Sequence, residues 1–198
     1  MNAASYLRLH ARNQPDTVAL RFPSAAYRTQ EPTWDSLTYA ELDRWSDELA
    51  YGFDDFGVTA GEKTLVLVKP SLEFYAMLFG LLKVGAVPVL LDPGMGLKRL
   101  FRCIAQTAPT TMVALTVVQL IASFIRAPFR SVQRKITVGP RLFWGGRTLA
   151  QCRFARKDAF PLATLQPTEK MAIVFTSGST GTPKGVVWSQ ALFRAQVE

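Results

Sequence analysis

The residues with the clearest chemical potential lie near the C-terminal end of the chain, in the segment Ile173–Gly185, whose sequence is IVFTSGSTGTPKG. A strand-like apolar run, Met171 to Phe175, leads directly into hydroxyl side chains and glycines. Gly178 and Gly181 permit positive φ, so that backbone N–H groups can converge on an anion. The segment therefore predicts a loop that holds polyphosphate.

Side chains of the same loop complete the expected phosphate cradle. The predicted binding residues are Thr176, Ser177, Gly178, Ser179, Thr180, Gly181, Thr182 and Lys184. Hydroxyl groups can donate to phosphate oxygens, and Lys184 supplies a mobile point charge next to the rigid φ of Pro183. This combination indicates the handling of a nucleoside triphosphate.

A Walker A loop is the nearest alternative, because it also combines glycines and a lysine in the pattern G-x-x-x-x-G-K-[ST]. Alignment of its first glycine on Gly178 places Pro183 where the second glycine is required and Gly185 where Ser or Thr must bind magnesium. The apolar run Val186 to Trp188 then predicts a strand, whereas a Walker loop opens into a helix. We therefore reject this alternative.

The segment instead resembles the phosphate-binding signature of the acyl-adenylate-forming (AMP-binding) superfamily, of the acyl-CoA synthetase and fatty-acyl-AMP ligase type. A plain Gly/Ser/Thr linker would not explain the two flanking apolar runs or the Pro-Lys-Gly end. The resemblance implies an enzyme that uses ATP and Mg²⁺ to adenylate a carboxylate with release of pyrophosphate. It also implies that Lys184 is catalytic, because its charge would stabilise the leaving pyrophosphate.

The upstream sequence predicts an α/β fold, a layered sheet with flanking helices. Thr38 and Glu41 form a capping box that opens a helix, which we expect to end at Gly57. The later elements alternate in type, with strands at 64–68, 87–91, 112–115 and 135–138 and helices at 72–84, 97–106, 117–125 and from 190 onward. This β-α-β order indicates parallel strands.

Two further segments are similar to sequences of the superfamily. Gly80–Val89 resembles an early core motif, and we expect a structural role for Lys83, since a cation near a helix C-terminus stabilises the helix dipole. Asp92-Pro93-Gly94 has turn chemistry. Residues 137–146 resemble the subgroup that activates long-chain β-hydroxy acids to β-lactones in bacterial olefin biosynthesis, although a Gly-Gly turn beside a packing Trp144 explains them equally well.

The composition indicates a globular chain of 198 residues with 48% hydrophobic residues and a net charge of +8. No signal peptide or membrane-spanning segment is predicted, so we expect a cytoplasmic location. The basic residues between Arg126 and Arg147 are best explained as a solvated surface. Peripheral contact with a membrane is left open. We expect no nucleic-acid partner. Cys103 and Cys152 are too few for a metal site, and His10, as the single histidine, argues against a Ser-His-Asp triad.

The resemblance also implies that residues 1–198 are part of an N-terminal nucleotide- and acyl-binding domain, with the C-terminal domain absent. Many members have a histidine where this chain has Gln190, and their adenine pocket, ribose-binding aspartate and late lysine would follow Glu198. We therefore expect this polypeptide alone to bind ATP poorly and to adenylate nothing. The implied partners are a fatty-acid-like carboxylate and CoA or an acyl carrier protein. A truncated, non-catalytic interaction module is the alternative.

Overall fold

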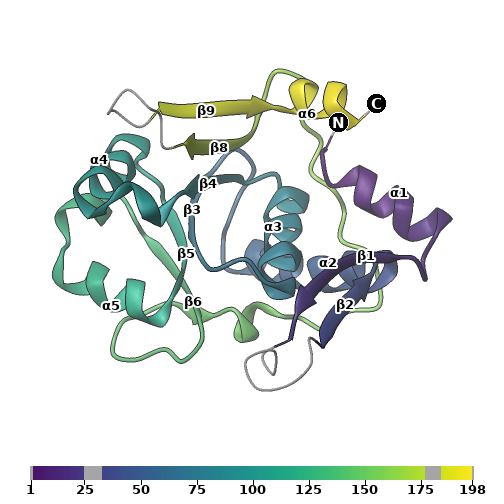
Figure 1. Cartoon of the computed structure of the whole chain (residues 1–198), viewed down its shortest axis with the longest axis horizontal. Helices are drawn as coiled ribbons and strands as arrows, with labels where there is room; N and C mark the ends of the chain where they lie inside the picture. Colours follow the sequence, from purple (N-terminus) through teal and green to yellow (C-terminus); the bar gives the residue numbers. More distant parts are fainter. Residues whose placement is uncertain (1, 25–32, 177–183, 198) are drawn as a thin grey trace.

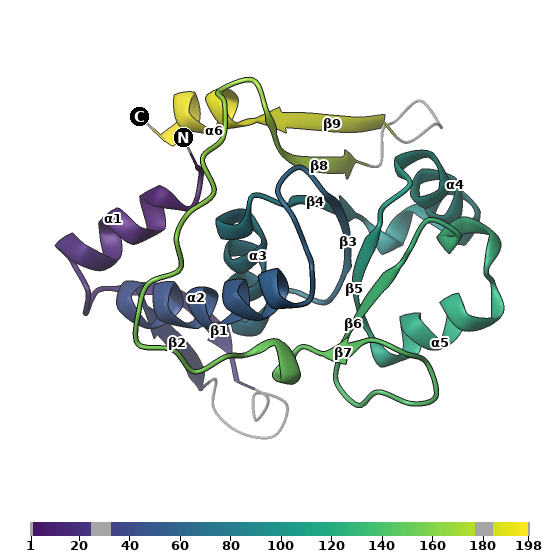
Figure 2. The same cartoon turned by 180° about the vertical axis from the view of Figure 1, so that it is seen from behind.

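The computed structural model describes residues 2–24, 33–176 and 184–197, and its centre is a sheet with helices on both faces (Figure 1; Figure 2 shows the opposite side). In spatial order the strands are β7 (Arg147–Thr148), β6 (Arg134–Val138), β5 (Thr111–Leu115), β3 (Lys63–Leu67), β4 (Val87–Leu91), β8 (Lys170–Thr176) and β9 (Lys184–Ser189). All described pairings in this sheet are parallel except the pairing of β8 with β9. The predicted α/β class is thus confirmed.

The remaining elements surround this sheet. The helices are α1 (Ser5–Asn13), α2 (Tyr39–Asp55), α3 (Leu72–Val84), α4 (Leu97–Thr107), α5 (Thr116–Phe124) and α6 (Gln190–Val197), with short 3-10 turns η2 (Pro93–Met95), η3 (Ala127–Phe129) and η4 (Ala150–Cys152). Strands β1 (Val18–Pro23) and β2 (Trp34–Thr38) form a separate antiparallel pair. Among the described helices, none combines the length and the apolar character needed to cross a bilayer.

Alternate residues of the central strands divide the apolar interior into two cores. Leu65 and Met112 belong to the core that includes α4, whereas the next residues, Val66 and Val113, belong to the core that includes α2 and α3. Successive side chains of a strand point to opposite faces of a sheet. The two helix layers therefore cover opposite faces of the same sheet.

The sequence predicted most of these elements well. Helix α3 and strand β4 have the predicted bounds, and α3 ends at Gly85 with φ of 84°. The capping box is present, since the Thr38 N–H donates to Glu41 Oε2 over 2.9 Å and the Glu41 N–H to Thr38 Oγ1 over 3.2 Å. The β1–β2 pair and the two-residue strand β7 were not predicted.

Both cysteines are small side chains of the interior. Cys103 and Cys152 are both free thiols in the interior. Burial raises the pKa of the Cys152 thiol to about 11, so that the reactive thiolate is disfavoured at neutral pH. Neither residue contributes to a site.

A carboxylate at the start of β3 ties together the amino ends of three strands. Glu62 Oε1 accepts hydrogen bonds from Thr110 Oγ1 and Thr111 Oγ1, each over 2.6 Å, and pairs with Arg134 over 2.9 Å. Burial by itself raises the pKa of Glu62, but these hydrogen bonds, the Thr59 backbone amide and the Arg134 charge outweigh it and hold the pKa below its usual value of 4.5.

We predict that Glu62→Gln weakens the acid sensitivity of the fold. Because the pKa of Glu62 is lower in the folded than in the unfolded state, its contribution to the free energy of unfolding is present above pH 4.5 and is lost as the pH falls through the folded-state pKa. Urea unfolding of both proteins at pH 7 and pH 3 measures this. The stability gap between wild type and variant should shrink at pH 3, and a gap that widens there would contradict the assignment.

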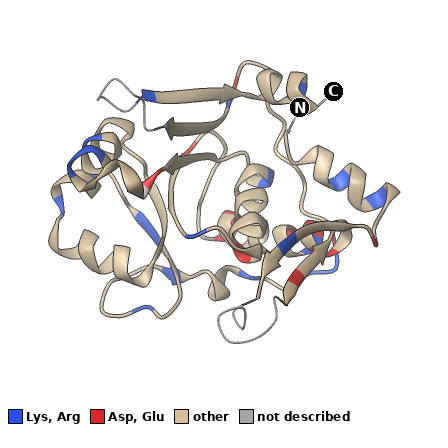
Figure 3. Cartoon of the chain, in the orientation of Figure 1, with Lys and Arg blue, Asp and Glu red and all other residues tan. Residues whose placement is uncertain are grey.

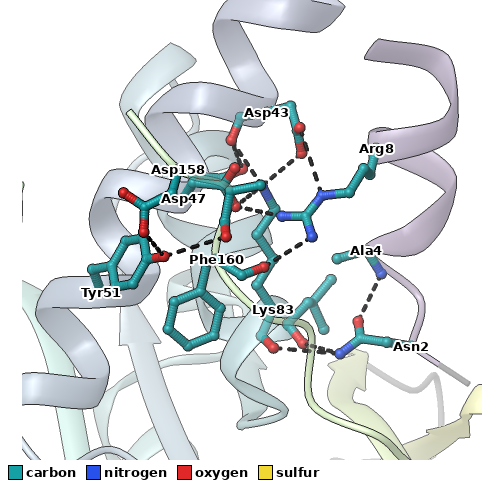
Figure 4. Close-up of polar contacts among 12 residues, drawn as sticks. Asn2, Ala4, Arg8, Asp43, Asp47, Tyr51, Lys83, Asp158 and Phe160 are labelled. Carbon is teal, nitrogen blue, oxygen red and sulfur yellow. Dashed lines mark hydrogen bonds and ion pairs between the residues drawn. The ribbon is translucent and has the colours of Figure 1, made fainter. Parts of the chain in front are cut away.

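A buried ion cluster joins the three N-terminal helices (Figure 4). The side chain of Lys83 on α3 is 0% exposed, and its Nζ lies 2.6 Å from Asp43 Oδ1 and 2.7 Å from Asp47 Oδ1, both on α2. Arg8 on α1 donates to Asp47 over 2.6 Å and to the Phe160 carbonyl over 2.8 Å. Burial lowers the pKa of Lys83, while the two carboxylates act in the opposite direction. Lys83 is therefore structural, as the sequence indicated.

We predict that Lys83→Met lowers the free energy of unfolding by about 3 to 5 kcal/mol, because removal of one partner leaves the other buried charges uncompensated. Urea unfolding monitored by circular dichroism measures the change. Lys98→Met, at an exposed position on α4, is the matched control and should leave stability unaltered. Equal stability of Lys83→Met and wild type would refute the importance of the cluster.

Candidate functional site

The predicted phosphate loop joins the two strands of an antiparallel hairpin. Strand β8 lies inside the sheet beside β4, and β9 returns along its other side, with Thr176 directly opposite Lys184. Residues 177–183, which include the predicted Ser177, Gly178, Ser179, Thr180, Gly181 and Thr182, lie outside the described residues. The structure thus fixes where the loop begins and ends.

The structure describes the two ends of the loop to different extents. Lys184 is the first residue of β9 and is exposed, whereas only the backbone of Thr176 is described. The chain after Lys184 continues as a strand, as we predicted when rejecting the Walker A alternative. The predicted roles of both residues in phosphate binding stay predictions.

The glycine after Lys184 has a packing role that the sequence did not reveal. Gly185 lies opposite Phe175, and a Cβ atom at position 185 would come within 2.8 Å of the Phe175 ring. Phe175 is buried in the core shared with α4. Gly185 therefore lets β9 pass close to a buried ring, directly after Lys184.

The carboxyl ends of the parallel strands lie at the same edge of the sheet as the start of the loop. Strands β3 and β4 run parallel to each other and to β8, so Leu67, Leu91 and Thr176 mark one edge. Asp92, just after β4, accepts a hydrogen bond from the Gly94 N–H over 2.8 Å. The expected turn chemistry of this residue is thus confirmed.

An apolar cavity of about 490 Å³ opens along this edge. It lies where the chain order reverses, because β3 is followed by α3 on one face and its neighbour β5 by α5 on the other. Ligands of open α/β sheets bind in such crevices. The lining residues come from the ends of β3, β4 and β5 and from α3, α4 and α5, and they include Val68, Phe74, Leu91, Phe101, Leu115 and Val118.

The sequence does not reveal this cavity, because its lining comes from several separate elements. From the sequence, Leu67 and Leu115 are recognised only as strand residues, and Val118 is recognised only as a core residue of a helix. A cavity of this size and character suits a hydrophobic chain, since small-molecule sites are mostly apolar clefts of about 300 to 1,000 Å³. Among the lining residues that the structure describes, Lys69 is the one that carries a charge, and it is exposed.

Gln190, where the superfamily often has histidine, is buried at the opposite end of β9 from Lys184. The side-chain Oε1 of Gln190 accepts a hydrogen bond from the Ala3 N–H over 2.9 Å. The backbone N–H of Gln190 donates to the Glu169 carbonyl over 3.0 Å. These contacts tie the start of α6 to the segment before α1. In this chain the residue therefore has a structural role.

No ready-made metal site is present in the part of the chain that the structure describes, where no group of three or more His, Cys, Asp or Glu side chains could hold an ion. Magnesium commonly keeps most of its waters and binds through substrate phosphates and one or two carboxylates. Binding of Mg²⁺ by this chain stays a prediction.

Comparisons with curated proteins found related enzymes. The chain is 39% identical over 207 residues to a protein of Stenotrophomonas maltophilia named olefin beta-lactone synthetase, covering 100% of this chain and 36% of that protein. It is 41% identical over 199 residues to a protein of the same name from Xanthomonas campestris pv. campestris, covering 99% and 35%. The chain thus spans about a third of the length of these relatives.

Solved structures share the fold. The apo structure of MbtA from Mycobacterium smegmatis superposes with a TM-score of 0.79 at 27% identity, covering 97% of this chain and 34% of that one. The N-terminal domain of FACL13 from Mycobacterium tuberculosis gives a TM-score of 0.76 at 23% identity, covering 96% and 44%, and supports the fold alone.

A family model described as AMP-binding enzyme matches residues 7–198, almost the whole chain. The match includes the hairpin that carries the predicted phosphate loop. The resemblance inferred from that loop is thereby confirmed, and the chain belongs to the AMP-binding enzyme family.

Proposed function

We propose that this chain is the N-terminal, nucleotide-binding part of an ATP-dependent ligase that adenylates a fatty or β-hydroxy fatty carboxylate. The observation that carries the proposal is the β8–β9 hairpin, in which β8 ends at Thr176 and β9 begins at Lys184 at the carboxyl edge of a parallel sheet. The names of the relatives that match over the whole chain support a β-hydroxy acid and lactone formation as the onward reaction. Transfer to CoA or to a carrier protein is the other onward reaction.

The proposed reaction is an in-line displacement at the α-phosphorus of ATP. A carboxylate oxygen forms a bond to this phosphorus while the bond to the bridging oxygen breaks, and pyrophosphate leaves with the electron pair. Mg²⁺ supplies charge neutralisation along the triphosphate. In this chain the hydroxyls and amides of residues 176–182 bind the phosphates, and the Lys184 ammonium stabilises the pyrophosphate oxygens.

The position of Lys184 suits this role. It is exposed at the start of β9, and its partner across the hairpin is the last residue of β8. Its ammonium can follow the departing phosphates, because lysine carries its charge on a flexible stem. The cation is thus placed beside the loop while the strands hold its backbone.

We predict that Lys184→Ala reduces ATP–pyrophosphate exchange by about 100-fold or more, as expected when a charged group that stabilises the transition state is lost. The measurement uses the protein translated from the complete reading frame, with a panel of fatty and β-hydroxy acids. Lys170→Ala, at the other end of the same hairpin, is the matched control and should retain exchange. An unchanged rate for Lys184→Ala would remove this role.

The apolar cavity supports a hydrophobic acid as the substrate. Its opening lies at the edge where the proposed nucleotide loop begins, and Lys69 in its lining offers a positive charge to an acid headgroup. A short, polar acid would leave most of this apolar surface in contact with water. We therefore assign the cavity to the hydrocarbon chain of the substrate.

We predict that Val118→Trp, which fills the cavity, lowers kcat/KM for dodecanoate by roughly tenfold relative to butanoate in the same exchange assay. Val117→Trp is the matched control, because Val117 is the preceding residue of α5, is 57% exposed and is not part of the lining. An equal effect on both acids, or an equal effect of both variants, would show that the cavity does not hold the chain.

The alternative function is a non-catalytic interaction module. In that case no acid on the panel would support pyrophosphate exchange by the complete protein, whereas the folded chain would still bind a partner. The 198-residue polypeptide should by itself form no acyl-AMP under the proposed function, because the nucleoside pocket implied by the family resemblance lies beyond it. Acyl-AMP formed by residues 1–198 would contradict that expectation.

A further inference from the structure

The charges of this chain are strongly segregated along the sequence. Residues 93–157 contain no Asp or Glu but carry twelve Lys and Arg residues, more than the net charge of +8 of the whole chain. Figure 3 shows basic segments over α4 and the loops near α5 and β6. This third of the chain therefore carries a local excess of positive charge, only part of which pairs with carboxylates of other segments.

Part of this positive charge lines a hollow of about 580 Å³ beside α5. The hollow is bounded by Arg126, Arg130 and Lys135, together with Phe143 and Trp144. None of the three cations makes an ion pair with any residue that the structure describes. Cations gathered around a hollow repel one another, so an anion bound between them would relieve this repulsion.

Exposed apolar side chains lie next to Phe143, which lines the hollow. Phe124 is 77% exposed and Phe143 is 70% exposed, and their ring centroids lie 6.3 Å apart in an edge-to-face arrangement. Leu142 and Ile125 beside them are also exposed. A continuous exposed apolar patch of this kind marks an interaction site.

The tip of the β6–β7 loop is anchored so that Phe143 stays outside. Trp144 is buried, and its Nε1–H donates to Thr137 Oγ1 on β6 over 3.0 Å. The Phe143 and Trp144 rings contact each other edge to face, with centroids 5.3 Å apart. One aromatic residue thus holds the loop to the sheet while its neighbour is displayed to solvent.

We propose that this basic–aromatic face, formed by Phe124, Phe143, Arg126, Arg130 and Lys135, binds the surface of an anionic phospholipid membrane. The rings enter the interfacial region of the bilayer, and the cations contact lipid phosphates in and around the hollow. Exposed aliphatic Leu142 and Ile125 favour lipid over nucleic acid, since hydrocarbon buries such side chains whereas bases stack on aromatic ones. The proposal is independent of the adenylation chemistry.

The charge contribution can be tested by vesicle sedimentation with the protein translated from the complete reading frame. Vesicles of equal parts phosphatidylcholine and phosphatidylglycerol should bind the chain, and pure phosphatidylcholine vesicles should bind it far less. Arg126→Gln with Arg130→Gln should weaken binding by roughly tenfold or more. Arg12→Gln with Arg21→Gln removes the same charge from exposed positions on α1 and β1 and is the matched control.

The apolar contribution requires a second pair of variants. Phe124→Ser with Phe143→Ser should weaken binding to the anionic vesicles by roughly tenfold, while circular dichroism shows an unchanged fold. Three results would overturn the proposal: equal binding to neutral and anionic vesicles, equal losses from the two arginine pairs, or no loss from the serine variant. Tighter binding to a short RNA that is insensitive to the serine substitutions would assign the face to nucleic acid instead.

Discussion

The pairing of β8 with β4 is the interaction on which the candidate site depends. Val89, Leu90 and Leu91 pair in parallel with Ile173, Val174 and Phe175, although the paired residues are 84 positions apart in the chain. A parallel neighbour needs a crossover connection. In Figure 2 the segment between β7 and β8 runs past α2 and α1 before it enters β8. The predicted phosphate loop therefore begins at the carboxyl edge of the sheet only because the segment between β7 and β8 is held in place and brings β8 beside β4.

Several contacts hold the return segment against the N-terminal helices. The Phe154 N–H donates to the Glu48 carbonyl over 3.1 Å, and the Ala163 N–H donates to the Lys83 carbonyl over 3.0 Å. The Arg8 guanidinium reaches the Phe160 carbonyl from the buried ion cluster. Lys83 therefore supports the site indirectly, because its charge network fixes the helices along which the chain returns to β8.

Helix α5 links the two features that the sequence left unassigned. Its residues Val118 and Ile121 line the apolar cavity, while Ala122 and Ser123 line the basic hollow. One short helix therefore separates a compartment suited to a hydrocarbon chain from a face suited to an anionic surface.

The sequence by itself determined the elements with strong local signals. The capping box at Thr38 fixes the start of α2, and the positive φ of Gly85 ends α3, because these effects act within one turn of chain. The pattern of residues 173–185 identified the family for the same reason, since its glycines, hydroxyls and lysine are contiguous.

Only the tertiary structure decided which distant residues share a place. The described residues of β1 and β2 contain no strong turn signal that would predict their pairing. Strand β7 likewise exists because it pairs with β6. The cavity, the group of cations around the hollow and the burial of Gln190 each require residues from several elements to meet. No local pattern encodes such meetings, because they depend on the strand order and on which face of the sheet each helix covers.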